Sequence, residues 1–156
     1  MKLKARPATI KDKAQLLLWA NDQETRRQSF ITKRITKKEH HQWFSKVLTD
    51  KHNQRLFILE NDDKSPCGQV RFSRNDENDW EIHFSLDAQY RGQNLGRQMI
   101  RICLDIFKKN DQRLKLIAKV KKDNLASLKV LAAAGFEIEK NSSPDANNLK
   151  LIYITK

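Results

Sequence analysis

The sequence predicts a fold of the α/β (α+β) class, in which helices flank a central mixed β-sheet. Three observations predict it. Apolar residues recur at helical spacing in the first third of the chain and again after residue 94, while the middle alternates apolar and polar residues as strands do. No linker or internal repeat interrupts the 156 residues, so we expect one domain over residues 1–156.

The first half of the chain contains two expected helices followed by three expected strands. Residues 8–21 form the first helix, which Thr9 can cap. The second helix opens at Thr36, where Glu39 completes a capping box. The strands and the turns between them follow in order: strands 55–60, 69–74 and 80–86, with turns 61–68 and 75–79.

The second half alternates helices and strands. A long amphipathic helix begins near residue 95 and carries one apolar stripe: Leu95, Met99, Ile102, Cys103, Ile106 and Phe107. A strand is expected at 114–120. Asp123 or Asn124 then caps a helix that ends at Gly135. This helix is expected to pack through Leu125, Leu128 and Leu131. Strands at 136–139 and 149–154 close the fold, with the polar loop 141–145 between them.

Composition narrows the classes of function. Lys and Arg number 31 against 19 Asp and Glu, a formal net charge of +12, which favours phosphate-rich or other polyanionic partners. No apolar run is long enough for a membrane span, and we expect no signal peptide. Cys67 and Cys103 have neither metal-ligand spacing nor a cystine framework. We therefore expect a cytoplasmic protein without a metal.

One strand-to-helix loop contains two of the four glycines, Gly92 and Gly96. Glycine permits positive φ and close ligand approach, and a helix N-terminus presents free N–H groups to an anion. Three arginines surround the loop: Arg91, Arg97 and Arg101. The pattern favours a phosphate or pyrophosphate site, and a plain tight turn remains the alternative.

This loop resembles the acetyl-CoA motif of the GNAT superfamily of N-acetyltransferases, Gln/Arg-x-x-Gly-x-Gly/Ala. Arg91 matches its first position and Gly96 its last, whereas Asn94 replaces the middle glycine. Asn tolerates the left-handed backbone, so the turn can form. A second element, Asn124 to Gly135-Phe136, is similar to the family's Asn-x-x-Ser/Ala helix that ends in Gly-Phe. The resemblance covers nearly the whole chain and implies a GNAT-like fold with acetyl-CoA as co-substrate.

By this resemblance, the strand ending at Leu86 would hold the pantetheine arm, and N–H groups of the loop would hold the pyrophosphate. Asn124 and Ser127 would lie near the pantetheine arm. The cofactor-binding residues so implied are Leu86, Arg91, Gly92, Gln93, Asn94, Leu95, Gly96, Arg97, Asn124 and Ser127. The alternative is that Asn124 is only a helix cap and Ser127 only a first-turn residue.

The N-terminal third contains a distinctive series of residues: Trp19-Ala20-Asn21-Asp22, Arg26, Ser29-Phe30, Ile35-Thr36, and His40 or His41 before Trp43-Phe44. This series is similar to that of acetyltransferases of pseudaminic acid biosynthesis, which acetylate the 4-amino group of a UDP-linked amino-dideoxy sugar. It resembles, more weakly, the N-terminal acetyltransferases of ribosomal proteins. The substrate-binding residues implied are Trp19, Asn21, Arg26, Phe30, His40 and Trp43. Trp43 follows a capping box and is equally explained as a core residue. The family often pairs as dimers, which implies a homodimer.

Candidate catalytic residues lie on the strand before the loop. Glu81, His83 and Ser85 alternate with apolar residues and so share one face, where Glu81 or His83 can accept a proton. A merely solvated face is the alternative. In the family the amine attacks acetyl-CoA directly, and many members have a tyrosine acid seven residues after the motif asparagine. That position is Leu131 here.

Two readings without catalysis remain open at this stage. The positive charge is compatible with a nucleic-acid-binding module, although no aromatic-studded basic strand or helix-turn-helix pattern supports one. A protein that binds coenzyme A as a regulator is the other reading, given Asn94 and Leu131 at two motif positions.

Overall fold

A computed structural model describes residues 1–110, 115–140 and 147–154. Its strands are β1 (Lys4–Pro7), β2 (Gln54–Glu60), β3 (Pro66–Arg74), β4 (Trp80–Leu86), β5 (Lys115–Lys121), β6 (Glu137–Ile138) and β7 (Asn148–Ile154). Its α-helices are α1 (Lys13–Ala20), α2 (Gln23–Gln28), α3 (Lys37–Thr49), α4 (Leu95–Lys108) and α5 (Leu125–Ala134). Short 3₁₀ turns lie at Ile10–Asp12 and Ala88–Tyr90.

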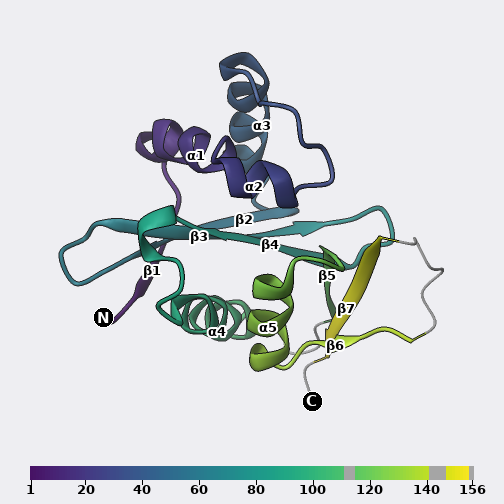
Figure 1. Ribbon diagram of the computed structural model, residues 1–156. Coiled ribbons are helices and arrows are strands. Elements are labelled where there is room, and N and C mark those ends of the chain that lie inside the picture. Colours follow the sequence, from purple (N-terminus) through teal and green to yellow (C-terminus); the bar gives the residue numbers. More distant parts are fainter. Residues whose placement is uncertain (111–114, 141–146, 155–156) are drawn as a thin grey trace.

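The strands form one seven-stranded sheet in the order β1-β2-β3-β4-β5-β7-β6. Neighbouring strands from β1 to β4 are antiparallel, β4 and β5 are parallel, and β5, β7 and β6 are again antiparallel. Helices α1, α2 and α3 lie on one side of the sheet, and α4 and α5 lie on the other (Figure 1). The expected mixed sheet flanked by helices is confirmed.

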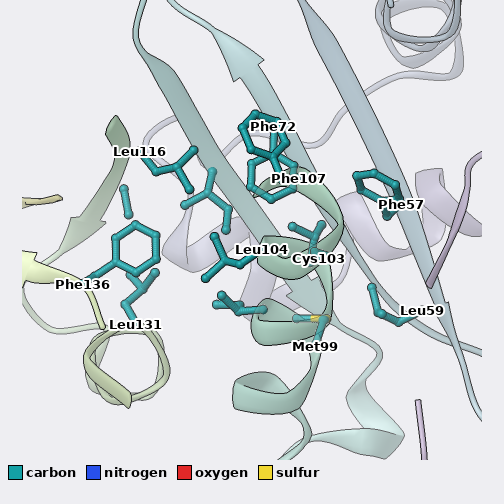
Figure 2. Close-up of a cluster of buried hydrophobic side chains, with 14 of the residues drawn as sticks. Phe57, Leu59, Phe72, Met99, Cys103, Leu104, Phe107, Leu116, Leu131 and Phe136 are labelled. Atoms are coloured by element: carbon teal, nitrogen blue, oxygen red, sulfur yellow. The ribbon is translucent and has the colours of Figure 1, made fainter. Parts of the chain in front are cut away.

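The main core lies between the sheet and helix α4. The expected apolar stripe of this helix is confirmed in part, because Ile102 and Ile106 are only partly buried while Ile100 and Leu104, which were not expected, are buried. Met99, Cys103 and Phe107 are fully buried on this helix, and Phe107 stacks on Phe72 of β3 with ring centroids 4.3 Å apart. Figure 2 shows α4 between the sheet residues and Leu131 of α5. Dense packing of this kind fixes α4, and therefore its N-terminal loop, against the strands.

A smaller core joins α1 and α3 to the other face of the sheet. Its buried residues are Leu16, Trp19, Phe44, Val47, Leu56 and Ile58. Helix α3 begins at the predicted capping box: Glu39 N donates to Thr36 Oγ1 at 3.1 Å, and Thr36 N donates to Glu39 Oε2 at 2.8 Å. The two apolar clusters thus place helices on both faces of the sheet.

Two elements were not predicted. Strand β1 lies at the sheet edge, where it pairs with β2, and its Ala5 packs against the main core. Arg6 adds a bridge to the following 3₁₀ turn, since its Nη1 and Nη2 donate to both carboxylate oxygens of Asp12 at 2.8 Å. Helix α2 buries no residue, and its start is set by Asp22, whose Oδ2 accepts from Thr25 N at 3.0 Å. Strand β1 is thus too short for a period to stand out, and a polar cap rather than periodicity begins α2.

Other expectations need correction. The turn predicted at 61–68 is too long, since Pro66–Gly68 belongs to β3. Leu125 was expected to pack, yet it is 64% exposed at the first position of α5. Leu131 is fully buried, and Gly135 ends the helix at φ 101° as expected. The predicted start of β5 at 114 and the loop 141–145 lie outside the described residues.

Candidate active site

The loop between β4 and α4 adopts the backbone that its glycines suggested. Gly92 has φ 75°, and Asn94 has φ 59° and ψ 17°, the left-handed conformation, immediately before α4 begins. Asn94 therefore adopts the left-handed backbone conformation at the position where the family motif has glycine. Gly96 has a different role: a Cβ there would lie 2.9 Å from Val130 Cγ2, so it permits α4 and α5 to pack closely.

The N-terminus of α4 leaves backbone donors available. The Asn94 side chain makes no capping hydrogen bond, so the first N–H groups of a 14-residue helix point outward without a side-chain acceptor. Arg97 lies in the first turn of the helix, and a hollow of about 390 Å³ runs from Asn94 along the side of α4 past Arg97 and Arg101 to Asp105. Orphan donors, the helix dipole and the Arg97 guanidinium together suit a pyrophosphate.

The Arg91 side chain points elsewhere. Its Nε and Nη2 donate to the carbonyl oxygen of Leu86 at 3.2 and 3.1 Å, and Nη2 also donates to Asp22 Oδ2 at 2.6 Å. Arg91 thus contacts the protein through Nε and Nη2, the two nitrogens on one edge of its guanidinium. The backbone of the loop, with Arg97, would then supply the donors for an anion.

The sheet opens beside this loop. Among the described residues, strands β4 and β5 pair only near their N-terminal ends, Trp80 with Leu116 and Glu81 with Ile117. The second half of β4 therefore lies outside the ladder with β5, and its backbone groups on that side are available to a bound extended chain. Leu86 ends this stretch, directly before the loop.

Asn124 and Ser127 lie at the start of α5. Asn124 Oδ1 accepts from Ser127 N at 3.1 Å, which is the capping interaction given above as the alternative to a cofactor contact. Asn124 is thus the cap, rather than Asp123.

Glu81 and His83 lie together on β4, on the sheet face that α1 and α3 partly cover. Glu81 Oε2 is 3.8 Å from His83 Nε2, and that same nitrogen lies 3.2 Å from Ser73 Oγ on β3. Lys119 of β5 pairs with Glu81 Oε1 at 2.9 Å. Ser85 shares the face but lies further along the strand, where its Oγ accepts from Gln69 Nε2 at 3.2 Å.

Burial and neighbouring charges set the protonation of Glu81 and His83. Burial opposes ionisation of Glu81, but the ion pair with Lys119 and a hydrogen bond from Asn75 outweigh it and lower the pKa of Glu81. Although 43% of the His83 side chain is exposed, loss of hydration around its ring and the charge of Arg71 lower its pKa to about 4. At neutral pH the pair is therefore a carboxylate beside a neutral imidazole.

Glu81 also forms part of the wall of a hollow of about 280 Å³. The residues around it carry both signs of charge, together with one amide and one isoleucine: Asn75, Asp76, Glu77, Glu81, Ile117, Lys119 and Lys150. Such a hollow can receive an ammonium group and an anionic group at the same time.

Comparison with known proteins now identifies the family. Residues 2–137 match the family model described as the acetyltransferase (GNAT) domain. The chain belongs to the GNAT family. Comparison with curated protein sequences found no match.

Solved GNAT and related structures share the fold. A domain from Methanocaldococcus jannaschii superposes with a TM-score of 0.83 at 20% identity, covering 98% of each chain. Spermidine N-acetyltransferase from Vibrio cholerae, in complex with CoA and spermine, gives a TM-score of 0.85 at 17% identity, covering 98% of this chain and 95% of that one. An aminoglycoside acetyltransferase in complex with coenzyme A gives 0.81 at 17% identity, with the same coverage.

The protein is therefore an N-acetyltransferase of the GNAT type that uses acetyl-CoA. The residues present fit this co-substrate, because the uncapped N-terminus of α4, the left-handed Asn94 and the short β4–β5 ladder provide donors for a pyrophosphate and an open strand edge. Among the described residues, no cluster of metal-ligating side chains is found, and no helix is long and apolar enough to span a bilayer.

Two of the six residues expected to bind the acceptor are buried. Trp19 is 5% exposed and donates from Nε1 to Asp87 Oδ2 at 2.8 Å; His40 is 2% exposed and packs against Trp43 and Phe44. Both rings belong to the helical layer, and contact of Trp19 and His40 with the substrate stays a prediction.

The other four residues expected to bind the amine substrate are partly or fully exposed: Asn21, Arg26, Phe30 and Trp43. Asn21 bonds both backbone groups of Ile35 at 2.8 Å, and Arg26 donates to Ile31 O and Ser29 Oγ at 2.9 Å. These two side chains brace the segment after α2. Phe30 is 54% exposed on that segment, and Trp43 is half-buried beneath the Arg71 guanidinium.

The family's usual tyrosine position is part of the core here. Leu131 is fully buried, so no acid occupies that place. The two tyrosines lie elsewhere: Tyr153 packs on Phe136 with ring centroids 5.3 Å apart, and Tyr90 lies beside Cys67 and Asn61.

Sequence reasoning did not single out Arg71, Ser73 or Lys119. Ser73 lies directly opposite Glu81, and Arg71 opposite His83, in the antiparallel register of β3 and β4. Their alternation within the predicted strand 69–74 was visible in the sequence, but the strand register that places them beside Glu81 and His83 was not. Lys119 reaches Glu81 from β5, a contact that only the sheet order reveals.

Proposed function

We propose that this N-acetyltransferase acetylates the amino group of a nucleotide-linked amino-dideoxy sugar, of the UDP-4-amino-sugar kind used in pseudaminic acid biosynthesis. The observation that carries the proposal is the hollow beside Glu81, whose wall contains both carboxylates and lysines. An acceptor with an amine at one end and a diphosphate at the other matches both signs of charge. The formal net charge of +12 supports an anionic acceptor in the same way.

Acetyl transfer requires the acceptor amine to be neutral when it attacks. When bound, acetyl-CoA supplies the acetyl group as an activated thioester. The positive charges of Arg71 and Lys119, which lower the pKa of His83, also disfavour a protonated amine nearby. His83 is neutral at physiological pH, and Ser73 orients its ring through Nε2. Because a pKa of about 4 makes His83 a weak base, in this proposal it passes the proton of the amine on to water beside the carboxylate of Glu81 rather than keeping it.

Positioning supplies much of the catalysis in this proposal. Leu131 provides no acid for the departing thiol, so water, Ser85 or Ser127 takes that role. Holding the amine against the acetyl carbonyl makes the reaction effectively intramolecular, which contributes several kcal/mol, ~7 or more in well-oriented systems. The braced segment after α2, with exposed Phe30 and half-buried Trp43, forms the acceptor side of the site in this proposal.

Competition with UDP tests the acceptor class. The acetylation rate of a UDP-amino sugar should fall as UDP is added, because the diphosphate competes for the lysines. Lys119→Gln should weaken inhibition by UDP, whereas Lys122→Gln, an exposed lysine away from the hollow, is the matched control. Acetylation that UDP leaves unchanged would contradict a nucleotide-linked acceptor.

Two other amine classes serve as comparison arms. Peptide N-termini represent the weaker resemblance to acetyltransferases of ribosomal proteins. Spermidine represents a purely cationic amine, which the carboxylates of Asp76, Glu77 and Glu81 would attract. Efficient turnover of either in place of the amino sugar would replace the proposed acceptor. We also propose, from the resemblance, a cytoplasmic homodimer, for which the mass in solution is the check on assembly.

A further inference from the structure

One carboxylate oxygen joins helix α2 to the coenzyme loop. Asp22 Oδ2 accepts from Arg91 Nη2 at 2.6 Å, from Thr25 N at 3.0 Å and from Thr25 Oγ1 at 3.2 Å. The first contact crosses 69 residues of sequence, and the other two begin α2. A single aspartate thus caps a helix on the acceptor side and binds the first residue of the coenzyme motif.

The same guanidinium holds the end of β4. Arg91 donates twice to the carbonyl oxygen of Leu86, at 3.2 Å from Nε and 3.1 Å from Nη2. A second hydrogen bond to this region runs from Trp19 Nε1 on α1 to Asp87 Oδ2 at 2.8 Å. Two polar contacts therefore connect the junction between β4 and the loop to helices α1 and α2.

We propose that Asp22 and Arg91 are a positioning pair for acetyl-CoA. Arg91 acts on the protein rather than on a phosphate: it fixes the Leu86 carbonyl and the entry to the loop, and Asp22 holds Arg91 in place. The inference rests on the family activity and on the loop as the coenzyme site, and it is independent of which amine is acetylated. It also assigns to Asp22, outside the coenzyme motif, a role in coenzyme affinity.

The alternative assignment, direct contact of Arg91 with phosphate, makes the opposite prediction for Asp22. If Arg91 were needed at the phosphate, removing its carboxylate partner would free it and leave coenzyme affinity equal or higher. If Arg91 positions the loop, removing Asp22 should weaken binding as much as removing Arg91. The two effects should then not add, because they disrupt one unit.

Calorimetric titration with coenzyme A on Asp22→Asn, Arg91→Gln and the double variant tests the pair. We expect each single variant to raise the Kd about tenfold, the scale of one lost charge-assisted hydrogen bond, and the double variant to be no weaker than the singles. The KM for acetyl-CoA should rise similarly, with kcat changing less. Glu24→Gln, which removes the Arg27 ion pair on the same helix, is the matched control and should bind normally.

Folding is checked separately by thermal unfolding. If Asp22→Asn unfolds at the assay temperature, Arg91→Lys replaces it, since lysine keeps the charge but cannot bridge Leu86 and Asp22 in the same geometry. Because lysine can still pair with a phosphate, direct contact predicts that Arg91→Lys binds coenzyme A clearly better than Arg91→Gln, whereas positioning predicts that the two variants bind equally weakly. Unchanged or tighter binding by a folded Asp22→Asn, or fully additive losses in the double variant, overturns the proposal.

Discussion

Asn94 is the position at which the acetyl-CoA loop departs from its family motif, and it permits a quantitative test. Its backbone lies at φ 59° and ψ 17°, directly before α4. For an L-residue other than glycine this conformation costs about 1–2 kcal/mol, and Asn bears less of that cost than most. A β-branched residue is the least tolerated there. Asn94→Val should therefore shift the loop toward conformations in which φ is negative.

The expected loss of affinity follows from that conformational cost. A penalty of about 1–2 kcal/mol reduces the population of the binding-competent loop about five- to thirtyfold. The apparent Kd rises by the same factor, because it equals the intrinsic Kd divided by the competent fraction. Asn94→Gly carries no such penalty and should bind coenzyme A within about twofold of the parent protein.

Isothermal titration calorimetry with coenzyme A measures both variants directly. Far-ultraviolet circular dichroism at the titration temperature establishes that each is folded. If Asn94→Val binds coenzyme A as tightly as Asn94→Gly, the left-handed turn is not what shapes the site, and the reasoning is refuted.

Further predictions concern catalysis, pH and packing. Glu81→Gln should lower kcat about a hundredfold or more if the carboxylate assists proton removal, with coenzyme binding unchanged in calorimetry. The lowered pKa of His83, about 4 against 6.5, means that the unfolded chain binds more protons between these values. Stability should therefore fall as pH drops through that window, and His83→Gln should flatten urea-unfolding midpoints measured from pH 7 to 4.

Gly68→Ala should destabilise by about 1–3 kcal/mol in urea titrations, because its Cβ would lie 2.6 Å from the backbone oxygen of Ser85; an unchanged midpoint would contradict this close approach. Leu131→Ala should lower the free energy of unfolding by about 2–5 kcal/mol, whereas Leu125→Ala, at an exposed position, should change it by no more than about 0.5 kcal/mol. Equal effects of the two substitutions would contradict the burial of Leu131.

Most of the fold was predictable from the sequence, because burial of one face of a helix or strand makes apolar residues recur at a fixed spacing. The apolar stripe of α4 and the alternation of Trp80, Ile82 and Phe84 in β4 correspond to observed elements, and the capping box at Thr36 forms as expected. Strand β1 has only four residues and helix α2 buries none, so neither shows such a period. Strand β1 depends on pairing with β2, which is distant in sequence, and α2 begins at the Asp22 cap.

The candidate site was predictable only in part. The glycines and Asn94 specify a turn within a few residues, so the loop was visible in the sequence. The surroundings of Glu81 were not, because Ser73 and Lys119 reach it from two neighbouring strands. The burial of Trp19 was not predictable, because an aromatic residue on a helix gives the same sequence pattern whether it packs inward or contacts a ligand.

The most direct test of acceptor and activity together is release of free thiol from acetyl-CoA in the presence of a UDP-linked 4-amino sugar. We predict thiol release that saturates with the sugar and requires its free amino group, with little release from N-terminal peptides or spermidine at equal concentration. Release with peptides or spermidine, but not with the UDP-amino sugar, would contradict the proposed acceptor and leave the GNAT coenzyme site as described.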